Sequence, residues 1–495
     1  MKNGFSKGLT KEEKLEIARK YLNIPEKLDK GDILLVTPTW RKFTYLNREV
    51  KSATISHPPL AMATIASPLV ESGYNVRILD LDLYENPGSL LKKTIEEFKP
   101  KLVATSGSTP LFDGIVSIAK LAKEIDKNII TVVGGPHATA FPEHFLETGY
   151  FDYVVNGQGD FVLLDILNNK NRDEMDSIAY MDGNNVIKKN QTTIEDLDII
   201  PMPSWHLVEV EKYANSYILS RKNPVGPIET SRGCHASCCY CNKKIFGWKV
   251  RFKSSKRVVD EMQYMLEIGF NELHVQDDLF SSDLKRAKEI ADLIVERKMN
   301  FPWMLTNGVR VDTVDLEFLL KIKKAGCYRL AFGIESGNQE VLDSVQKNIT
   351  LDQVRRAVKL AKIAKIETFG FFMLALPTDT EETMQQTIDF AKELDVDLPK
   401  FVITTPYPGT RLYDIYDRQN LIKSKNWSDY LQHNIDMSHI FNHPNLSWDT
   451  IAKYYKKAFR EVYFRPNYIY RRFKKSLKEH TLIQDMKTVA TTSWF

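Results

Sequence analysis

The sequence predicts an α/β protein with two units in tandem and a mainly helical region after them. Short apolar runs alternate with amphipathic segments from Asp32 to about Asn168, and a similar series runs from Pro227 to Thr404. Four of the five cysteines fall between Cys234 and Cys241, directly after the first apolar run of the second series. The pattern therefore predicts two parallel sheets covered by helices, with clustered thiols at one strand end.

Length and composition limit the possibilities. A chain of 495 residues is too long for one hydrophobic core and suggests about two to four domains. The formal net charge of +4 is small for this length, so no nucleic-acid partner is expected. The longest apolar stretch, Phe369 to Leu376, is far too short to span a membrane. No signal peptide is recognisable, so the expected location is the cytoplasm.

The first unit, at 31–170, follows a helical extension at 1–30 and is typical of a doubly wound sheet of the flavodoxin or Rossmann-like kind. Ligands of such sheets bind outside the carboxyl ends of the strands, where hydroxyls and glycines contact them. Any single turn is more simply explained as a tight strand-to-helix connection. The expected strands are Asp32–Thr37, Asn75–Asp80, Lys101–Ser106, Asn128–Gly134 and Asp152–Val155, and the candidate ligand contacts are Thr37, Ser106, Gly134, Gly135, His137, Gly157 and Gly159.

The second unit, at 223–415, is predicted to be a partial (β/α)6 barrel. A linker is expected at 171–222, because Leu197–Trp205 contains two prolines and no periodicity. Sites in barrels are built at the carboxyl ends of the strands, and the thiols follow the first strand. The expected strands are Pro227–Ser231, Asn271–Gln276, Phe301–Thr306, Cys327–Gly333, Glu367–Met373 and Asp397–Thr404.

The run Cys-x3-Cys-x2-Cys at Cys234, Cys238 and Cys241 is the most specific chemical signal. Three thiolates so spaced can hold three irons of a four-iron cluster and leave the fourth iron open. A disulfide is not expected in a cysteine-poor intracellular chain. Structural zinc normally takes four ligands, and the nearest additional candidates, His235 and Cys239, are cramped in the same loop. The spacing favours a cluster and leaves zinc as the alternative.

This cysteine run resembles the signature of radical S-adenosylmethionine (SAM) enzymes. The sequences starting at His57 (His-Pro-Pro-Leu), Gly134 (Gly-Gly-Pro-His-Ala-Thr) and Gly157 (Gly-Gln-Gly-Asp) resemble the cobalamin-binding domain that precedes many such barrels. The resemblance implies a [4Fe-4S] cluster, SAM and cobalamin as cofactors, with Cys234, Cys238 and Cys241 as catalytic metal ligands. No Asp-x-His-x-x-Gly run is present, so a histidine of that motif is not expected below the cobalt.

The resemblance also implies contacts with SAM. Tyr240 would lie near the adenine, although ordinary packing explains its side chain equally well. Asp277 and Asp278 would receive the ammonium group, and solvated turn acids are the alternative. Glu335 and Ser336 would reach the ribose or the methionine part of SAM, whereas Thr405 and Pro406 would line the adenine or substrate pocket.

In the activity that the family implies, cleavage of SAM yields a 5'-deoxyadenosyl radical, and methylcobalamin methylates an unactivated carbon of a small molecule, lipid or peptide. Ring formation, rearrangement or oxidation by the same machinery is the close alternative. A zinc or electron-transfer binding protein without catalysis is the alternative from another class. An electron donor such as flavodoxin or ferredoxin and oxygen-poor conditions are also implied.

The region 416–495 is expected to be helical, because apolar residues recur at helical spacing from Ile451 to Tyr463. A basic aromatic segment, Tyr468–Leu477, follows. Such a segment can lie on a membrane surface, although more often it packs on its own domain. Peripheral membrane contact is therefore a possibility that the sequence leaves open.

Overall fold

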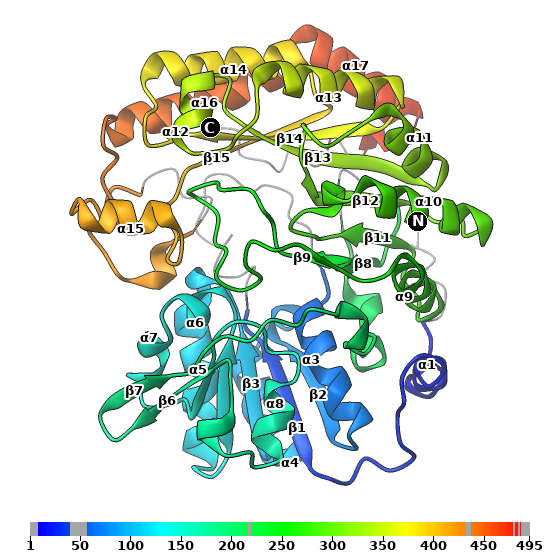
Figure 1. Cartoon of the computed structure of the whole chain (residues 1–495), viewed down its shortest axis with the longest axis vertical. Coiled ribbons are helices and arrows are strands. Elements are labelled where there is room, and N and C mark those ends of the chain that lie inside the picture. Colours follow the sequence, from blue (N-terminus) through cyan, green and yellow to red (C-terminus); the bar gives the residue numbers. More distant parts are fainter. Residues whose placement is uncertain are drawn as a thin grey trace.

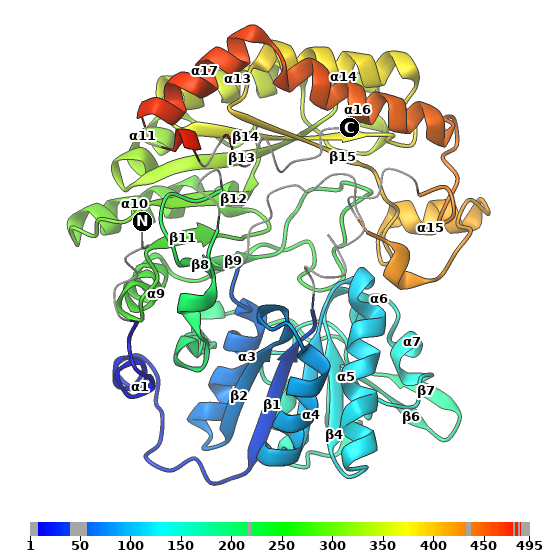
Figure 2. The ribbon, with the colours of Figure 1, turned by 180° about the vertical axis from the view of Figure 1, so that it is seen from behind.

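The computed structural model describes residues 8–39, 57–215, 219–431, 437–478, 481–483 and 486. Two α/β units lie against each other, with the first unit below the barrel in Figure 1 and the C-terminal helices at the opposite end (Figures 1 and 2). This arrangement confirms the predicted fold class of a doubly wound domain, a partial barrel and a helical C-terminal region.

The first sheet has the strand order β2-β1-β3-β4-β5-β6-β7. Its parallel strands are β1 (Asp32–Thr37), β2 (Asn75–Asp80), β3 (Leu102–Ser106), β4 (Ile130–Gly134) and β5 (Tyr153–Val155). Helices cover both faces: α3 (Leu60–Glu71) and α8 (Val162–Leu167) pack on one, and α4 (Pro87–Phe98), α5 (Phe112–Ile125) and α7 (Pro142–Leu146) on the other. The short α6 (Pro136–Ala140) follows β4.

Continuous apolar strands explain this double cover. Ile33 and Leu35 face one helical layer, Leu34 and Val36 face the other, and all four are fully buried. A strand buried on both faces cannot alternate apolar and polar residues. The strand order reverses between β1 and β3, and the crevice at such a reversal is where doubly wound sheets bind ligands.

The second sheet is entirely parallel and has the order β15-β14-β13-β12-β11-β8. Its strands are β8 (Val225–Ile228), β11 (Glu272–Val275), β12 (Trp303–Val309), β13 (Cys327–Glu335), β14 (Glu367–Leu374) and β15 (Leu398–Ile403). The helices after the strands are α9 (Ser255–Glu267), α10 (Leu284–Glu296), α11 (Leu316–Lys324), α12 (Gln339–Ser344), α13 (Leu351–Ile363), α14 (Glu381–Leu394) and α15 (Arg411–Arg418). All six strands of the predicted barrel are thereby confirmed.

The first helix and the helices of the C-terminal region pack on the barrel. The N-terminal α1 (Lys11–Ala18) contacts α9, and α16 (Trp448–Tyr463) packs on α14 and β15. The last helix, α17 (Pro466–Lys478), follows α16 along the outside of the barrel (Figure 2). Within the described ranges, no helix is long and apolar enough to cross a membrane.

The structure differs from the expected linker at 171–222. Residues Ile178–Asp182 (β6) and Asn185–Lys188 (β7) extend the first sheet with antiparallel strands, so this part belongs to the first unit. Further on, Trp205 and Tyr213 are buried in the core of the barrel, and the Trp205 ring packs edge-on against Phe270 with centroids 5.2 Å apart. The prolines that suggest a linker lie in a segment without regular structure whose side chains are nevertheless anchored.

Replacing Trp205 by Ala tests this anchoring. The indole is completely buried, so its removal should lower the free energy of unfolding by about 3–5 kcal/mol. Urea unfolding followed by circular dichroism measures the change. The matched control is Ile199→Ala in the same segment, where the side chain is 58% exposed and a change below about 0.5 kcal/mol is expected. Similar losses in both variants would show that Trp205 is not a core residue.

Candidate active site between the two units

The three cysteines lie in the loop between β9 (Ser231–Arg232) and β10 (Arg251–Phe252), at the carboxyl end of the barrel sheet. None of Cys234, Cys238 and Cys241 forms a disulfide. Cys238 is buried, Cys234 is half-buried and Cys241 reaches the surface. The loop therefore presents three free thiols at the place where barrel sites are built.

These thiols do not converge on one point, and in the described part of the chain no three His, Cys, Asp or Glu side chains could hold a single ion. A four-iron cluster does not require such convergence, because each cysteine binds a different iron. The cysteines are neighbours all the same, because the Cys241 amide donates a hydrogen bond to the Cys238 carbonyl at 3.3 Å. The donor set thus fits a cluster held by one loop.

Asp277 fixes the root of this loop. Its buried carboxylate accepts hydrogen bonds from the Thr230 amide at 2.6 Å, the Thr230 hydroxyl at 2.5 Å and the Ser231 hydroxyl at 2.6 Å. These partners belong to the protein itself, so the structure gives Asp277 a positioning role instead of the expected contact with SAM. No local pattern predicts this role, because the partners lie 46 and 47 residues earlier in the chain.

Asp278 and Gly233 shape the turn that leads into the cysteines. Asp278 accepts a hydrogen bond from the Gly233 amide at 3.0 Å. Gly233 has φ of +90°, and a Cβ at this position would lie 2.3 Å from the carbonyl oxygen of Lys249. Any other residue would displace the backbone of the loop, so glycine is required here.

Arg232 joins the two units. Its guanidinium forms a bidentate ion pair with Asp160 at 2.7 and 2.9 Å, donates to Gln158 at 3.0 Å and pairs with Glu229 at 2.6 Å. The side chains of Arg232 and Asp160 are only 6% and 5% exposed. Arg232 is two residues before Cys234, and Asp160 is in the turn after β5. The pair therefore holds the cysteine loop against the carboxyl end of the first sheet.

Glu335, at the end of β13, lies beside the cysteines. It has a left-handed backbone with φ of +67°, and Ala375 after β14 has φ of +59°. Such strain costs roughly 1–3 kcal/mol per residue and is concentrated at functional sites. Glu335 accepts a hydrogen bond from Lys347 Nζ at 2.7 Å. Burial disfavours the charged lysine, but Glu335 and the nearby Cys238 raise the pKa of Lys347.

The other expected SAM contacts differ in how their polar atoms are engaged. The Tyr240 hydroxyl is buried near Cys238 and has no hydrogen-bond partner at normal distance among the described residues, so it is available to a bound molecule. The Ser336 hydroxyl lies 3.2 Å from Thr387 Oγ1 and accepts from the Asn338 amide at 3.1 Å. The hydroxyl of Thr405 donates to the Ile403 carbonyl at 3.3 Å, and Pro406 beside it is buried. Tyr240 is the best placed of this set to contact a ligand.

At the reversal of the first sheet, two buried hydroxyls have no hydrogen-bond partner in the part of the chain that the structure describes. They belong to Thr37 at the end of β1 and Thr105 near the end of β3. Next to them, Gly135 has φ of +101°, and a Cβ there would lie 2.7 Å from Ser106 Oγ. Unpaired donors and bare backbone at this edge fit a large polar ligand such as cobalamin. The strand ends also bring Gly134, Gly157 and Gly159 to this edge.

His137 does not face this edge. Its ring is fully buried, with Nδ1 3.2 Å from Thr109 Oγ1 and Nε2 3.2 Å from His144 Nδ1. Burial and, less strongly, His144 lower the pKa of His137 to about 3, so the ring is neutral. Phe112, Phe145 and Trp427 pack around it. The side chain of His137 therefore lies in an aromatic core, because α6 turns it there, and its contact with a ligand stays a prediction.

A histidine pair that the sequence did not reveal connects the units. His57 Nε2, from the segment before α3, lies 2.9 Å from His274 Nδ1 on β11, and Gln276 Nε2 lies 2.6 Å from His57 Nδ1. His274 Nε2 lies 2.8 Å from Glu272, which also accepts from the Tyr328 hydroxyl at 2.6 Å. Burial lowers the pKa of both histidines, so two neutral rings lie in the interface.

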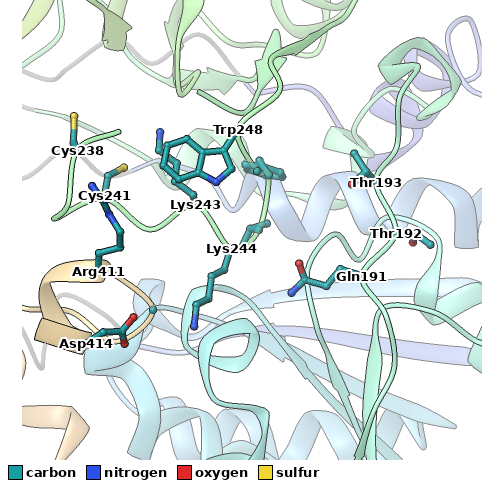
Figure 3. Close-up of a pocket in the computed structure, with 14 residues that line it drawn as sticks. Gln191, Thr192, Thr193, Cys238, Cys241, Lys243, Lys244, Trp248, Arg411 and Asp414 are labelled. Carbon is teal, nitrogen blue, oxygen red and sulfur yellow. The ribbon is translucent and has the colours of Figure 1, made fainter. Parts of the chain in front are cut away.

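A cavity of about 300 Å³ opens beside Cys238 and Cys241 (Figure 3). The cysteines lie on one side of it, and Gln191, Thr192 and Thr193 lie across from them. Lys243 and Lys244 add positive charge, and the side chain of Trp248 is 50% exposed. The remaining lining residues are Ile245, Phe246, Gly247, Gly409, Arg411 and Asp414. The cavity gives the cysteine loop access to solvent.

The chain matches two family models: the radical SAM superfamily over residues 228–391 and the B12 binding domain over residues 50–167. It is 33% identical over 417 residues to an uncharacterized methyltransferase of Pyrococcus horikoshii. The aligned region covers 83% of this chain and 88% of the relative. It is 30% identical over 370 residues to the anaerobic magnesium-protoporphyrin IX monomethyl ester cyclase of Rubrivivax gelatinosus, covering 72% of this chain and 66% of the relative.

Among solved structures, the fold is similar to the radical SAM methyltransferase TsrM from Kitasatospora setae with cobalamin and a [4Fe-4S] cluster bound. The TM-score is 0.66 at 17% identity, over 88% of this chain and 89% of TsrM. At this identity the match concerns the fold, and it covers both α/β units.

Replacing Asp160 by Asn tests the ion pair between the units. The variant leaves the buried Arg232 with Glu229 as its remaining carboxylate, so the free energy of unfolding should fall by about 3 kcal/mol. Chemical unfolding of anaerobically purified protein measures this. The control is Asp165→Asn, whose pair with Lys170 is 41% and 42% exposed and should contribute less than about 1 kcal/mol. Equal stability of the two variants would contradict the assigned role of Asp160.

Proposed function

The chain belongs to the radical SAM enzymes that carry a cobalamin-binding domain, and from this premise we propose that it methylates an unactivated carbon of a small-molecule substrate. The cofactors of this family are a [4Fe-4S] cluster, SAM and cobalamin. Zinc binding without catalysis, the alternative from another class, is set aside by family membership. The named methyltransferase relative supports methyl transfer as the reaction.

The observation that carries the proposal is the Arg232–Asp160 pair, because it brings the cysteine loop to the strand ends of the first sheet. When bound, the three cofactors supply a carbon-centred radical and a transferable methyl group. Methyl transfer to a substrate radical requires both sources to reach one carbon atom. A fixed distance between the two units would meet this requirement, because it would hold the radical source and the methyl source at a constant separation.

Each group of residues then has a defined task. Cys234, Cys238 and Cys241 would hold the cluster. The Tyr240 hydroxyl, Asp278 and Glu335 would bind and orient SAM, with Lys347 holding the Glu335 carboxylate in place. At the other edge, the hydroxyls of Thr37 and Thr105 would donate to cobalamin, with Ser106, Gly134 at the end of β4 and the glycines after β5 beside them.

The proposed electron donor is a small acidic redox protein of the flavodoxin or ferredoxin class. Cys241 is exposed and lines the cavity that contains Lys243 and Lys244. Within the described ranges neither lysine forms an ion pair with a carboxylate of the chain. Both lysines lie in the cluster loop, where Lys243 lies over the Trp248 ring and Lys244 over the Phe141 ring, and their positive charges are complementary to an acidic partner and would steer its approach.

A second candidate function is a radical reaction without methyl transfer, such as ring formation. The similarity to an ester cyclase at 30% identity favours it. Both reactions would use the same three cysteines and the same contact between the two units. They differ in the products derived from SAM.

Replacing Cys238 by Ser tests the cluster ligands. Loss of one of three thiolates should reduce iron bound after anaerobic reconstitution to background and abolish formation of 5'-deoxyadenosine. The matched control is Cys239→Ser in the next position, whose side chain packs in an apolar cluster with Leu376 and Tyr416. This variant should keep its iron. Iron and visible absorbance retained in Cys238→Ser, or lost equally in both variants, would overturn the ligand assignment.

The SAM-derived products test methylation itself. Turnover with substrate and a strong one-electron reductant should yield S-adenosylhomocysteine and 5'-deoxyadenosine in similar amounts, because one SAM supplies the methyl group and another supplies the radical. Chromatography with mass spectrometry quantifies both products. Formation of 5'-deoxyadenosine alone would replace methylation with the second candidate function.

A further inference from the structure

The last helix, α17, has its charged and apolar faces reversed relative to an ordinary surface helix. Arg471 pairs with Asp395, and Lys475 pairs with Glu367 at 2.7 Å, so both cations point toward the barrel. Tyr468 is buried, and its hydroxyl donates to the Asp397 carbonyl at 3.0 Å. The helix is thus attached to the protein chiefly by ion pairs and hydrogen bonds.

The opposite face of α17 is apolar and exposed. Ile469, Tyr470, Phe473 and Leu477 are 51%, 60%, 48% and 49% exposed, respectively. Ile469, Phe473 and Leu477 recur every four residues and therefore line one side of the helix. An amphipathic helix normally buries such a stripe against its own core. Here the stripe is turned away from the protein.

This concentration of exposed apolar side chains is specific to one place in the chain. Of the twelve large hydrophobic residues that are exposed in the described ranges, seven lie between Phe464 and Met486. Scattered exposed apolar residues need no explanation, but a contiguous group marks an interaction site. Figures 1 and 2 show α17 on the outside of the barrel, at the end of the molecule away from the first unit.

The charges around the stripe define its partner. The segment 466–478 contains five cations, Arg471, Arg472, Lys474, Lys475 and Lys478, and no acidic residue. Lys474 and Lys478 are exposed beside the stripe, and Lys474 Nζ lies 4.5 Å above the Tyr470 ring. Aromatic and aliphatic side chains with lysines at their edge match the boundary between acyl chains and anionic headgroups.

We propose that α17 binds peripherally to a membrane surface rich in anionic phospholipids. The four apolar side chains enter the boundary of the acyl region, while Lys474 and Lys478 contact the headgroups. A second copy of the chain fits less well, because a two-fold contact would bring the same cations together. A stable dimer also buries about 800 Å² per partner, which is more than four side chains provide. This surface function is independent of the proposed methyl transfer.

Vesicle sedimentation tests the proposal with full-length, cofactor-loaded protein. The probes are vesicles of phosphatidylglycerol mixed with phosphatidylcholine and vesicles of phosphatidylcholine alone. Wild type should bind the vesicles that contain phosphatidylglycerol at least tenfold more tightly than those of phosphatidylcholine alone. This binding should weaken as the salt concentration increases. The variant with Ile469→Ser, Phe473→Ser and Leu477→Ser should bind them at least tenfold more weakly than wild type. Its 5'-deoxyadenosine formation without vesicles should be unchanged.

The matched control carries Leu320→Ser and Ile363→Ser, which remove two side chains of similar exposure, 50% and 53%, from α11 and α13. It should bind vesicles like wild type. A second variant, Lys474→Glu with Lys478→Glu, should lose the preference for anionic vesicles. No vesicle binding by wild type, or equal binding by the triple variant, would overturn the proposal. A dimer in light scattering that the triple variant abolishes would identify a second copy as the occupant and would also overturn it.

Discussion

The ion pair between Arg232 and Asp160 is the constraint on which the arrangement of this enzyme depends. Two α/β units that fold around separate cores must meet with their strand ends facing each other, and hydrophobic contact alone does not fix that orientation. A bidentate guanidinium–carboxylate pair does fix it, because both hydrogen bonds require one relative orientation. Burial makes the pair costly to desolvate, so its value lies in specificity more than in net stability.

The histidine network gives the same interface a second fixed point. His57 Nε2 of the first unit lies 2.9 Å from His274 Nδ1 of the barrel. The other ring nitrogen of His274, Nε2, lies 2.8 Å from the Glu272 carboxylate. Since burial keeps both rings neutral, each can donate one hydrogen bond and accept one, which defines a single chain of donors and acceptors. Arg232 lies on β9 after the first barrel strand, whereas His57 contacts His274 on β11, so the two contacts hold the units together at separate points.

Strand bounds and the position of the cysteine loop could be predicted from the sequence. The bounds of β1 and β2 were predicted to the residue, and the cysteine loop falls after the first barrel strand, because apolar periodicity and motif spacing are local properties. The surroundings of His137 and Asp277 and the packing of the expected linker were not predicted, for the opposite reason. His137 is turned into a core by α6, Asp277 bonds to a loop far earlier in the chain, and Trp205 is anchored by tertiary packing. Arg232 and Asp160 are 72 positions apart in the chain, so no local sequence pattern predicts their ion pair.

Transfer of a methyl group to a substrate radical would require the two units to hold the cluster and the cobalamin at one fixed separation. Pulsed electron paramagnetic resonance between the reduced cluster and cob(II)alamin measures that separation directly in the loaded protein. A single narrow distance distribution in the wild type, which broadens when Asp160 and His57 are both replaced by Ala, is the predicted result. A broad distribution in the wild type would show that the units move freely and would contradict the account.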